Sequence, residues 1–252
     1  MRLPRFHRKR FLQRFAWTRA LFFFQEVPTF FWDGTVRLAP RRIQRLFTLW
    51  RGSTELRLES DLVFQSYRGG DVIDIGAADG WYSCLLAPRN PARVFSFEPD
   101  PPYYQKCQQN LSFLQTIFPQ TVFTVLPIAC GNGTPLSFAY QFGHLSLKIP
   151  ETKESTGLLP SLPLDRITEL FGLRPGFLKI DVEGFENEVL QGARQTITSH
   201  RPVLMLELHK FTPDFTTTRT STEVWLKSLG YRQNTFYESD LMVRSLFAVP
   251  SA

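Results

Sequence analysis

The sequence contains few cysteines and no long apolar run. Its 252 residues include three cysteines, Cys84, Cys107 and Cys130, which are widely spaced and form no CxxC pair. This odd number argues against a disulfide framework or a cysteine zinc site, so we expect small packing residues in a reducing compartment. The apolar runs are shorter than a transmembrane helix or a signal-peptide core. We therefore expect a cytoplasmic protein without a transmembrane helix.

Acidic residues are scarce near the start of the chain. Residues 1–51 contain 12 Lys and Arg but two acids, Glu26 and Asp33, whereas the remainder contains 17 basic and 21 acidic residues. The same segment holds 12 of the 36 aromatic residues. This composition fits a helical cap, a peripheral membrane contact, a nucleic-acid patch or a targeting peptide. We expect residues 1–60 to form a basic, aromatic-rich helical cap or membrane-surface segment, and residues 61–252 to form the main domain.

The main domain alternates between β-rich runs and helical patterns, which predicts a parallel sheet covered by helices on both faces. The expected strands are 71–77, 93–99, 122–130, 176–182 and 202–208. The expected helices are 81–87, 101–115, 163–171, 186–198 and 221–230. Residues 231–237 and 245–250 then predict an antiparallel hairpin. Five βα units followed by such a pair are typical of the α/β, doubly wound, seven-stranded class I methyltransferase (Rossmann-like) sheet with an antiparallel last strand.

The first expected strand runs into the sequence DIGAADG, residues 74–80. Gly76 allows a tight turn and a close approach of the backbone to a ligand, and Gly80 allows the next helix to begin close to the strand. The spacing is not the GxGxxG of dinucleotide sites. It matches the looser D-x-G-x-x-x-G that is typical of S-adenosylmethionine (SAM) sites.

A carboxylate ends the second expected strand. Glu98 lies 22 residues after Gly76, where it can accept hydrogen bonds from the two hydroxyls of a ribose. Asp100, followed by Pro101, is a good signal for a helix N-terminus. We expect Asp100 to cap the helix and Glu98 to face the ribose.

Several segments together resemble the FkbM-type methyltransferases. They occur in the family's order between about residues 70 and 210 and read DIGAADGWYS, FSFEPDPPYYQKCQQNL, LPLDRI, LKIDVEGFENEVLQGA and RPVLMLELH. The resemblance implies a class I methyltransferase fold and SAM as methyl donor. It also implies an acceptor hydroxyl on a sugar or a polyketide-like molecule.

The resemblance also implies roles for individual residues. Asp74, Gly76 and Gly80 would line the methionine part of SAM, and Glu98 would bind its ribose. Ala78 departs from the pattern, because it stands where many methyltransferases have a glycine. The remaining expected cofactor contacts are Pro99, beside the ribose acid, and Ala129 and Cys130, near the adenine.

Charged residues at the ends of the fourth and fifth expected strands are candidates for the chemistry. Lys179, Asp181 and Glu183 alternate with apolar residues, so we expect them on one face of a strand. Glu207 and His209 share a face of the next strand by the same rule. If the two strands are neighbours, Asp181, Glu207 and His209 converge as an oxygen, oxygen and nitrogen set for Mg²⁺ or Mn²⁺.

A metal-free alternative stays open at this point. In it, His209 or Asp181 is the general base, and Lys179 holds a carboxylate or stabilises developing charge. Glu186 fits a role at the N-terminus of its helix. His144, in a segment where a substrate loop would fall, is a candidate second base.

The leading hypothesis is a SAM-dependent O-methyltransferase that acts on a hydroxyl of a small molecule or glycan. The alternative is an inactive protein of the same fold that docks on a membrane or glycan surface through residues 1–51. We expect no nucleic-acid partner, because the excess positive charge is confined to that segment. The identity of the acceptor and the oligomeric state do not follow from the sequence.

Overall fold

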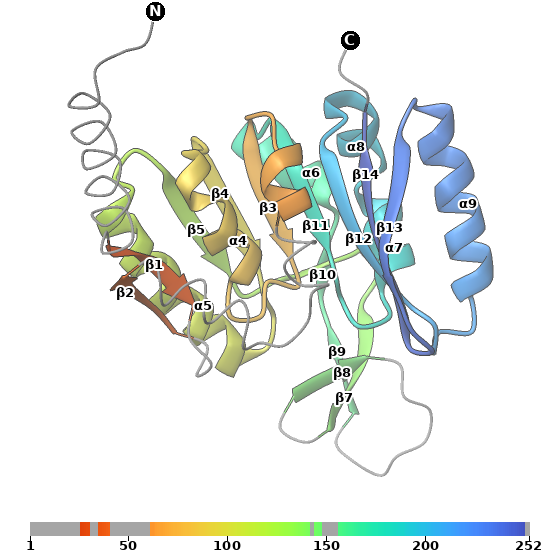
Figure 1. Ribbon diagram of the computed structural model, residues 1–252. Coiled ribbons are helices and arrows are strands. Elements are labelled where there is room, and N and C mark those ends of the chain that lie inside the picture. Colours follow the sequence, from red (N-terminus) through yellow and green to blue (C-terminus); the bar gives the residue numbers. More distant parts are fainter. Residues whose placement is uncertain (1–25, 31–34, 41–60, 142–143, 148–155, 250–252) are drawn as a thin grey trace, which may run out of the picture.

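A seven-stranded sheet forms the centre of the protein. The computed structural model describes residues 26–30, 35–40, 61–141, 144–147 and 156–249. The strands of the sheet are β3 (Asp71–Ile75), β4 (Arg93–Phe97), β5 (Val122–Leu126), β11 (Pro175–Ile180), β12 (Val203–His209), β13 (Arg232–Glu238) and β14 (Met242–Ala248). They are arranged in the order β13-β14-β12-β11-β3-β4-β5, with β14 antiparallel to both of its neighbours. The class I methyltransferase topology is confirmed (Figure 1).

Helices cover both faces of this sheet, as the alternation predicted. Those that follow the strands are α4 (Trp81–Leu86), α5 (Pro101–Ile117), α6 (Leu164–Phe171), α7 (Glu186–Gly192), α8 (Arg194–His200) and α9 (Phe215–Ser228). Neighbouring strand residues point to opposite faces and both are buried: Val72 packs with residues of α4, and Ile73 packs with residues of α6, α8 and α9. Burial on both faces explains the nearly continuous apolar character of the central strands.

Two smaller sheets accompany the main sheet. The short strand β6 (Ala129–Cys130) pairs in parallel with β10 (Ser161–Leu162). Beyond it, β7 (Leu136–Gln141), β8 (His144–Leu147) and β9 (Thr156–Leu159) form an antiparallel sheet that projects below the main sheet in Figure 1. Leu136 of β7 packs with Phe185, which follows β11, so the base of this sheet lies near the carboxyl end of β11.

The described part of residues 1–60 is a β-hairpin. β1 (Glu26–Phe30) pairs antiparallel with β2 (Val36–Pro40), and the two strands contact α4 and α5 respectively. These residues therefore differ from the helical segment that composition suggested. The rest of that segment lies outside the described residues, and the division at residue 60 stays a prediction.

Three element boundaries were predicted wrongly. The third strand ends at Leu126, because Pro127 has no N–H to continue the ladder. The helix expected over residues 186–198 is two helices, α7 and α8, which meet at Ala193. The last helix begins at Phe215 after the N-cap residue Asp214 and not near Ser221, because packing of Thr218, Thr222 and Leu226 overrides the weak helix propensity of threonine.

The cysteines are unpaired, as expected. Cys107 and Cys130 are buried and Cys84 is partly buried, and burial raises the pKa of the Cys84 thiol well above its usual value. Across the described ranges, we find no helix that combines the length and the apolar character needed to cross a bilayer.

The packing of α7 against the β6 segment depends on Gly192. A Cβ atom at this position would lie 1.9 Å from the carbonyl oxygen of Gly131. We expect Gly192→Ala to lower the free energy of unfolding by about 1–3 kcal/mol, because backbone must move to admit the methyl group. Gln195→Ala, on the exposed side of α8, should change it by less than about 0.5 kcal/mol. Urea unfolding of both variants measures the difference, and equal effects would contradict this role of Gly192.

Candidate active site

The loop after β3 is clamped between two neighbouring strands. Gly76 has a φ of +70°, and its N–H and that of Ala77 donate to the carbonyl oxygen of Phe97 on β4. A Cβ atom at Gly76 would lie 1.8 Å from the carbonyl oxygen of Asp181. Gly80, the N-cap residue of α4, also has positive φ. The glycine spacing noted in the sequence therefore lets the loop touch the end of β11 and turn directly into α4.

Asp74, in the strand that precedes this loop, binds residues of α4 and β11. Its carboxylate is fully buried and accepts hydrogen bonds from the backbone N–H and the hydroxyl of Ser83, at 3.1 and 2.8 Å. Its other oxygen lies 3.6 Å from Nζ of Lys179. A contact of Asp74 with a cofactor stays a prediction, since the structure assigns its oxygens to α4 and to β11.

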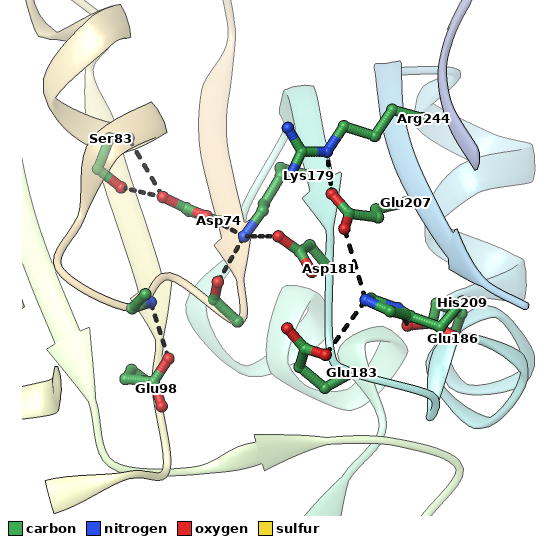
Figure 2. A network of polar contacts seen from close by, with 12 residues as sticks. Asp74, Ser83, Glu98, Lys179, Asp181, Glu183, Glu186, Glu207, His209 and Arg244 are labelled. Carbon is green, nitrogen blue, oxygen red and sulfur yellow. Dashed lines mark hydrogen bonds and ion pairs between the residues drawn. The ribbon is translucent and has the colours of Figure 1, made fainter. Parts of the chain in front are cut away.

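Glu98 joins the two loops at the carboxyl ends of β3 and β4. One carboxylate oxygen accepts from the N–H of Ala78 at 2.7 Å (Figure 2). The other accepts from the N–H of Asp100 at 2.9 Å. Burial raises the pKa of Glu98 to about 6, although these two backbone bonds lower it. Pro99 follows directly, and Asp100 is the N-cap residue of α5. The carboxylate is thus fixed beside the glycine loop.

The expected adenine contacts lie away from the third strand. Ala129 and Cys130 form β6, whose partner is β10, and both are buried. Cys130 belongs to the core under α6 and α8, and Ala129 packs with Leu136 and Phe185. Their role at a cofactor stays a prediction.

Lys179 connects the glycine loop with the acidic cluster. Its ammonium lies 3.4 Å from Asp181 and 3.6 Å from Asp74 and donates to the carbonyl oxygen of Gly76 (Figure 2). It also faces the ring of Tyr82. Burial alone would lower the pKa of Lys179, but Asp181 and Asp74 raise it above its usual value. Lys179 therefore stays charged.

Asp181 and Glu207 each lie against a basic side chain. Asp181 follows the last residue of β11 and lies against Lys179. Glu207 is buried on β12 and accepts a hydrogen bond from Nε of Arg244, its cross-strand neighbour on β14. Burial and the charge of Asp181 raise the pKa of Glu207 to about 7, while Arg244 lowers it.

His209, at the end of β12, is surrounded by carboxylates. Its Nδ1 lies 2.8 Å from Glu186, and its Nε2 lies 3.2 Å from Glu183 and 3.4 Å from Glu207. Burial would lower the pKa of His209, but the neighbouring carboxylates of Glu183 and Glu186 raise it to about 10. Without a further ligand, His209 is thus protonated and unsuited to accept a proton from a substrate.

The structure places some of the predicted site residues close together and others apart. One ligand atom from each of Asp181, Glu207 and His209 lies within 4.8 Å of the other two, which is the convergence expected for neighbouring strands. Glu183 does not continue the strand, since β11 ends at Ile180 and Glu183 has a φ of +52°. His144 lies on β8, and its side chain lies outside the described residues.

The contacts of the site that were not predicted include those of Ser83 with Asp74, Arg244 with Glu207, and Glu186 with His209. The contact of Arg244 with Glu207 could have been predicted by aligning the last strand with β12 in the correct register, because the two residues are then directly opposite each other. Glu186 lies in the first turn of α7, as expected, but its side chain is also 3% exposed and contacts His209.

Comparison with known proteins fits this geometry. The family description "Methyltransferase FkbM domain" matches residues 74–233. The chain belongs to the FkbM methyltransferase family. The hexuronic acid methyltransferase AglP of Haloferax volcanii is 26% identical over 175 residues, which cover 66% of this chain and 69% of that protein. The crystal structure of methyltransferase FkbM from Methylobacillus flagellatus has a TM-score of 0.53 at 20% identity, covering 81% of this chain but 54% of that one.

The buried ammonium group of Lys179 should contribute to the stability of this FkbM protein. Lys179→Met would leave Asp74 and Asp181 without their shared cation, so we expect the free energy of unfolding to fall by about 3–5 kcal/mol. Lys227→Met, on the exposed last turn of α9, should change it by less than about 0.5 kcal/mol. Urea unfolding at neutral pH measures both, and a similar small change in the two variants would refute the shared-cation role.

Proposed function

We propose that this protein is a SAM-dependent O-methyltransferase whose acceptor is a hydroxyl of a uronic acid sugar in a glycan. The observation that carries this proposal is the fixed carboxylate of Glu98 beside the glycine loop, next to an acidic and histidine cluster at the ends of β11 and β12. Family membership supports methyl transfer, and the relative whose name specifies hexuronic acid supports the acceptor class.

The residues at the end of β3 fit SAM. Gly76 and Gly80 let the loop pack closely against Asp181 and Cys107, which fixes it beside Glu98. Each oxygen of Glu98 keeps a lone pair for a ribose hydroxyl after accepting one N–H bond. SAM supplies a methyl group on a positively charged sulfur. The carboxylates of Asp181 and Glu183, which lie beyond the loop, favour that positive charge.

The residues at the ends of β11 and β12 fit the acceptor. The side chain of Asp181 is 23% exposed, whereas those of Lys179 and Glu207 are 3% exposed. Of these three groups, Asp181 is therefore the one that can reach an acceptor hydroxyl and align it with the methyl group. Alignment of this kind supplies a large part of the rate of a displacement reaction.

Phe211 offers a surface for the sugar ring. It is 47% exposed, and its ring centroid lies 5.1 Å from that of His209. A large exposed aromatic ring beside buried polar groups suits an acceptor that has one apolar face and several hydroxyls. We assign the acceptor platform to Phe211.

The Glu98 assignment predicts a pH-dependent affinity for SAM. Above a pH of about 6, Glu98 is ionised and accepts strong hydrogen bonds; below it, the protonated acid accepts them less well. We expect the dissociation constant of SAM, measured by calorimetry, to rise about tenfold or more as the pH falls through this value, since hydrogen bonds to a charged group contribute about 1.5–3 kcal/mol.

Glu98→Gln should bind SAM weakly across the whole pH range and lose this dependence. Glu169→Gln, which removes a similar charge on the exposed face of α6, should keep the wild-type profile. If the wild-type protein does not bind SAM at any pH, the proposed function is wrong.

The Phe211 assignment predicts an effect on acceptor binding. With SAM and a uronic-acid oligosaccharide, mass spectrometry should detect the gain of one methyl group per acceptor. Phe211→Ala should raise KM for the oligosaccharide several-fold, a loss of about 1 kcal/mol, and leave SAM affinity unchanged. Leu170→Ala, an equally apolar change at a 78% exposed site on α6, should leave KM unchanged. An unaltered KM in Phe211→Ala would remove Phe211 from the acceptor site.

A further inference from the structure

We propose that Asp181, Glu207 and His209 bind one divalent cation, Mg²⁺ or Mn²⁺, and that Glu186 positions His209 for this role. The inference rests on the proposed function only in placing the cation beside the acceptor hydroxyl. The binding of the cation itself follows from the geometry of the chain.

The three ligand groups come from adjacent strand ends. Ile180 of β11 pairs with Leu206 of β12, so Asp181 and Glu207 lie next to each other across the two strands, and His209 follows on the same face of β12. Their ligand atoms lie within 4.8 Å of one another. Atoms bound to one Mg²⁺ at about 2.1 Å lie about 3–4 Å apart, so small side-chain movements suffice. The two carboxylate oxygens suit Mg²⁺ or Mn²⁺, and the imidazole nitrogen is a ligand that Mn²⁺, the softer ion, accepts more readily than Mg²⁺.

Each carboxylate keeps an oxygen for the cation. Lys179 lies against Oδ2 of Asp181, and Arg244 donates to Oε2 of Glu207. The other oxygen of Glu207, Oε1, is the one that faces His209, at 3.4 Å from Nε2. The basic partners thus hold the two carboxylates in place and leave a ligand atom of each pointing into the space between the strands.

His209 provides the independent observation. Its side chain is 2% exposed, and its Nε2 makes no well-aligned hydrogen bond, although Glu183 and Glu207 are within 3.4 Å. A buried polar atom that lacks such a bond is costly. The atom is aimed at the same space as the oxygens of Asp181 and Glu207, where a cation would complete its bonding.

Glu186 supports a metal-ligand role of His209. It lies 2.8 Å from Nδ1 of His209 and is itself held by the N–H of Gly184 at 2.9 Å. When Nδ1–H donates to this carboxylate, the lone pair of Nε2 points toward the cation. Histidines that bind metals commonly have this carboxylate partner, which fixes the tautomer and the ring orientation.

A cation at this position has a chemical use in the proposed reaction. A hydroxyl bound to a divalent cation loses its proton more easily. Such a cation would lessen the need for a strong base, a role for which neither His209, surrounded by three carboxylates, nor Lys179, held as an ammonium group, is suited.

Manganese binding tests the inference directly. Untagged, full-length protein is treated with chelator, dialysed and titrated with MnCl₂, and the free ion is measured by electron paramagnetic resonance. We expect one bound Mn²⁺ per chain, loss of this binding in Asp181→Asn, and unchanged binding in Glu169→Gln, an exposed charge change on α6. Circular dichroism confirms that each variant is folded.

Glu186 is tested as a positioning residue by a pair of variants. Glu186→Ala should weaken Mn²⁺ binding about 10–100-fold. Glu186→Gln, whose amide oxygen can still accept from Nδ1–H, should restore most of the affinity. Equal losses in the two variants, or no loss in either, would overturn the positioning role.

Calorimetry with SAM on the same samples separates the two hypotheses. Protein that binds SAM but no Mn²⁺ overturns the cation site and leaves the proposed function standing. Protein that binds Mn²⁺ but no SAM supports the cation site and overturns the proposed function.

Discussion

The ammonium group of Lys179 is the interaction on which the rest of the site depends. It is 3% exposed and lies between Asp74 on β3 and Asp181 after β11. A buried charge without partners is very unfavourable, so the two carboxylates and the carbonyl oxygen of Gly76 must stay close to it. Gly76 belongs to the glycine loop and Asp181 to the acidic cluster. The ammonium group of Lys179 therefore fixes the distance between the loop and the cluster.

The topology could be predicted from the sequence because burial on both faces leaves a strong pattern. Strands such as β12, with all seven residues buried, read as apolar runs, and the hairpin of β13 and β14 identifies the antiparallel end. Boundaries were harder to predict. The division between α7 and α8 lies at Ala193, directly after Gly192, which packs closely against the distant Gly131. The helix α9 begins early because tertiary contacts compensate for a threonine-rich first half.

Contacts in the site could be predicted from the sequence where they depend on the order of the strands. Contacts that depend on the exact register between strands, or on a turn, could not. Asp181, Glu207 and His209 converge because parallel neighbours end at the same edge of the sheet. The contact of Arg244 with Glu207 requires the exact register of β14 against β12. The contact of Glu186 with His209 requires the turn at Glu183 and Gly184, where positive φ values direct the chain back over the end of β12. The alternation of polar and apolar residues in the sequence does not reveal a change of chain direction of this kind.

The position of the site follows from where the strand order reverses. The chain proceeds from β3 outward to β4 and β5 and then returns to add β11 on the other side of β3. Ligands in open α/β sheets bind at such a reversal, because the loops from the two central strands leave in opposite directions. Here the two loops meet directly, since no side chain fits between Gly76 and the carbonyl oxygen of Asp181. A methyl donor held on the β3 side and an acceptor held on the β11 side would therefore lie on the two sides of a direct backbone contact, with no side chain between the two loops at this point.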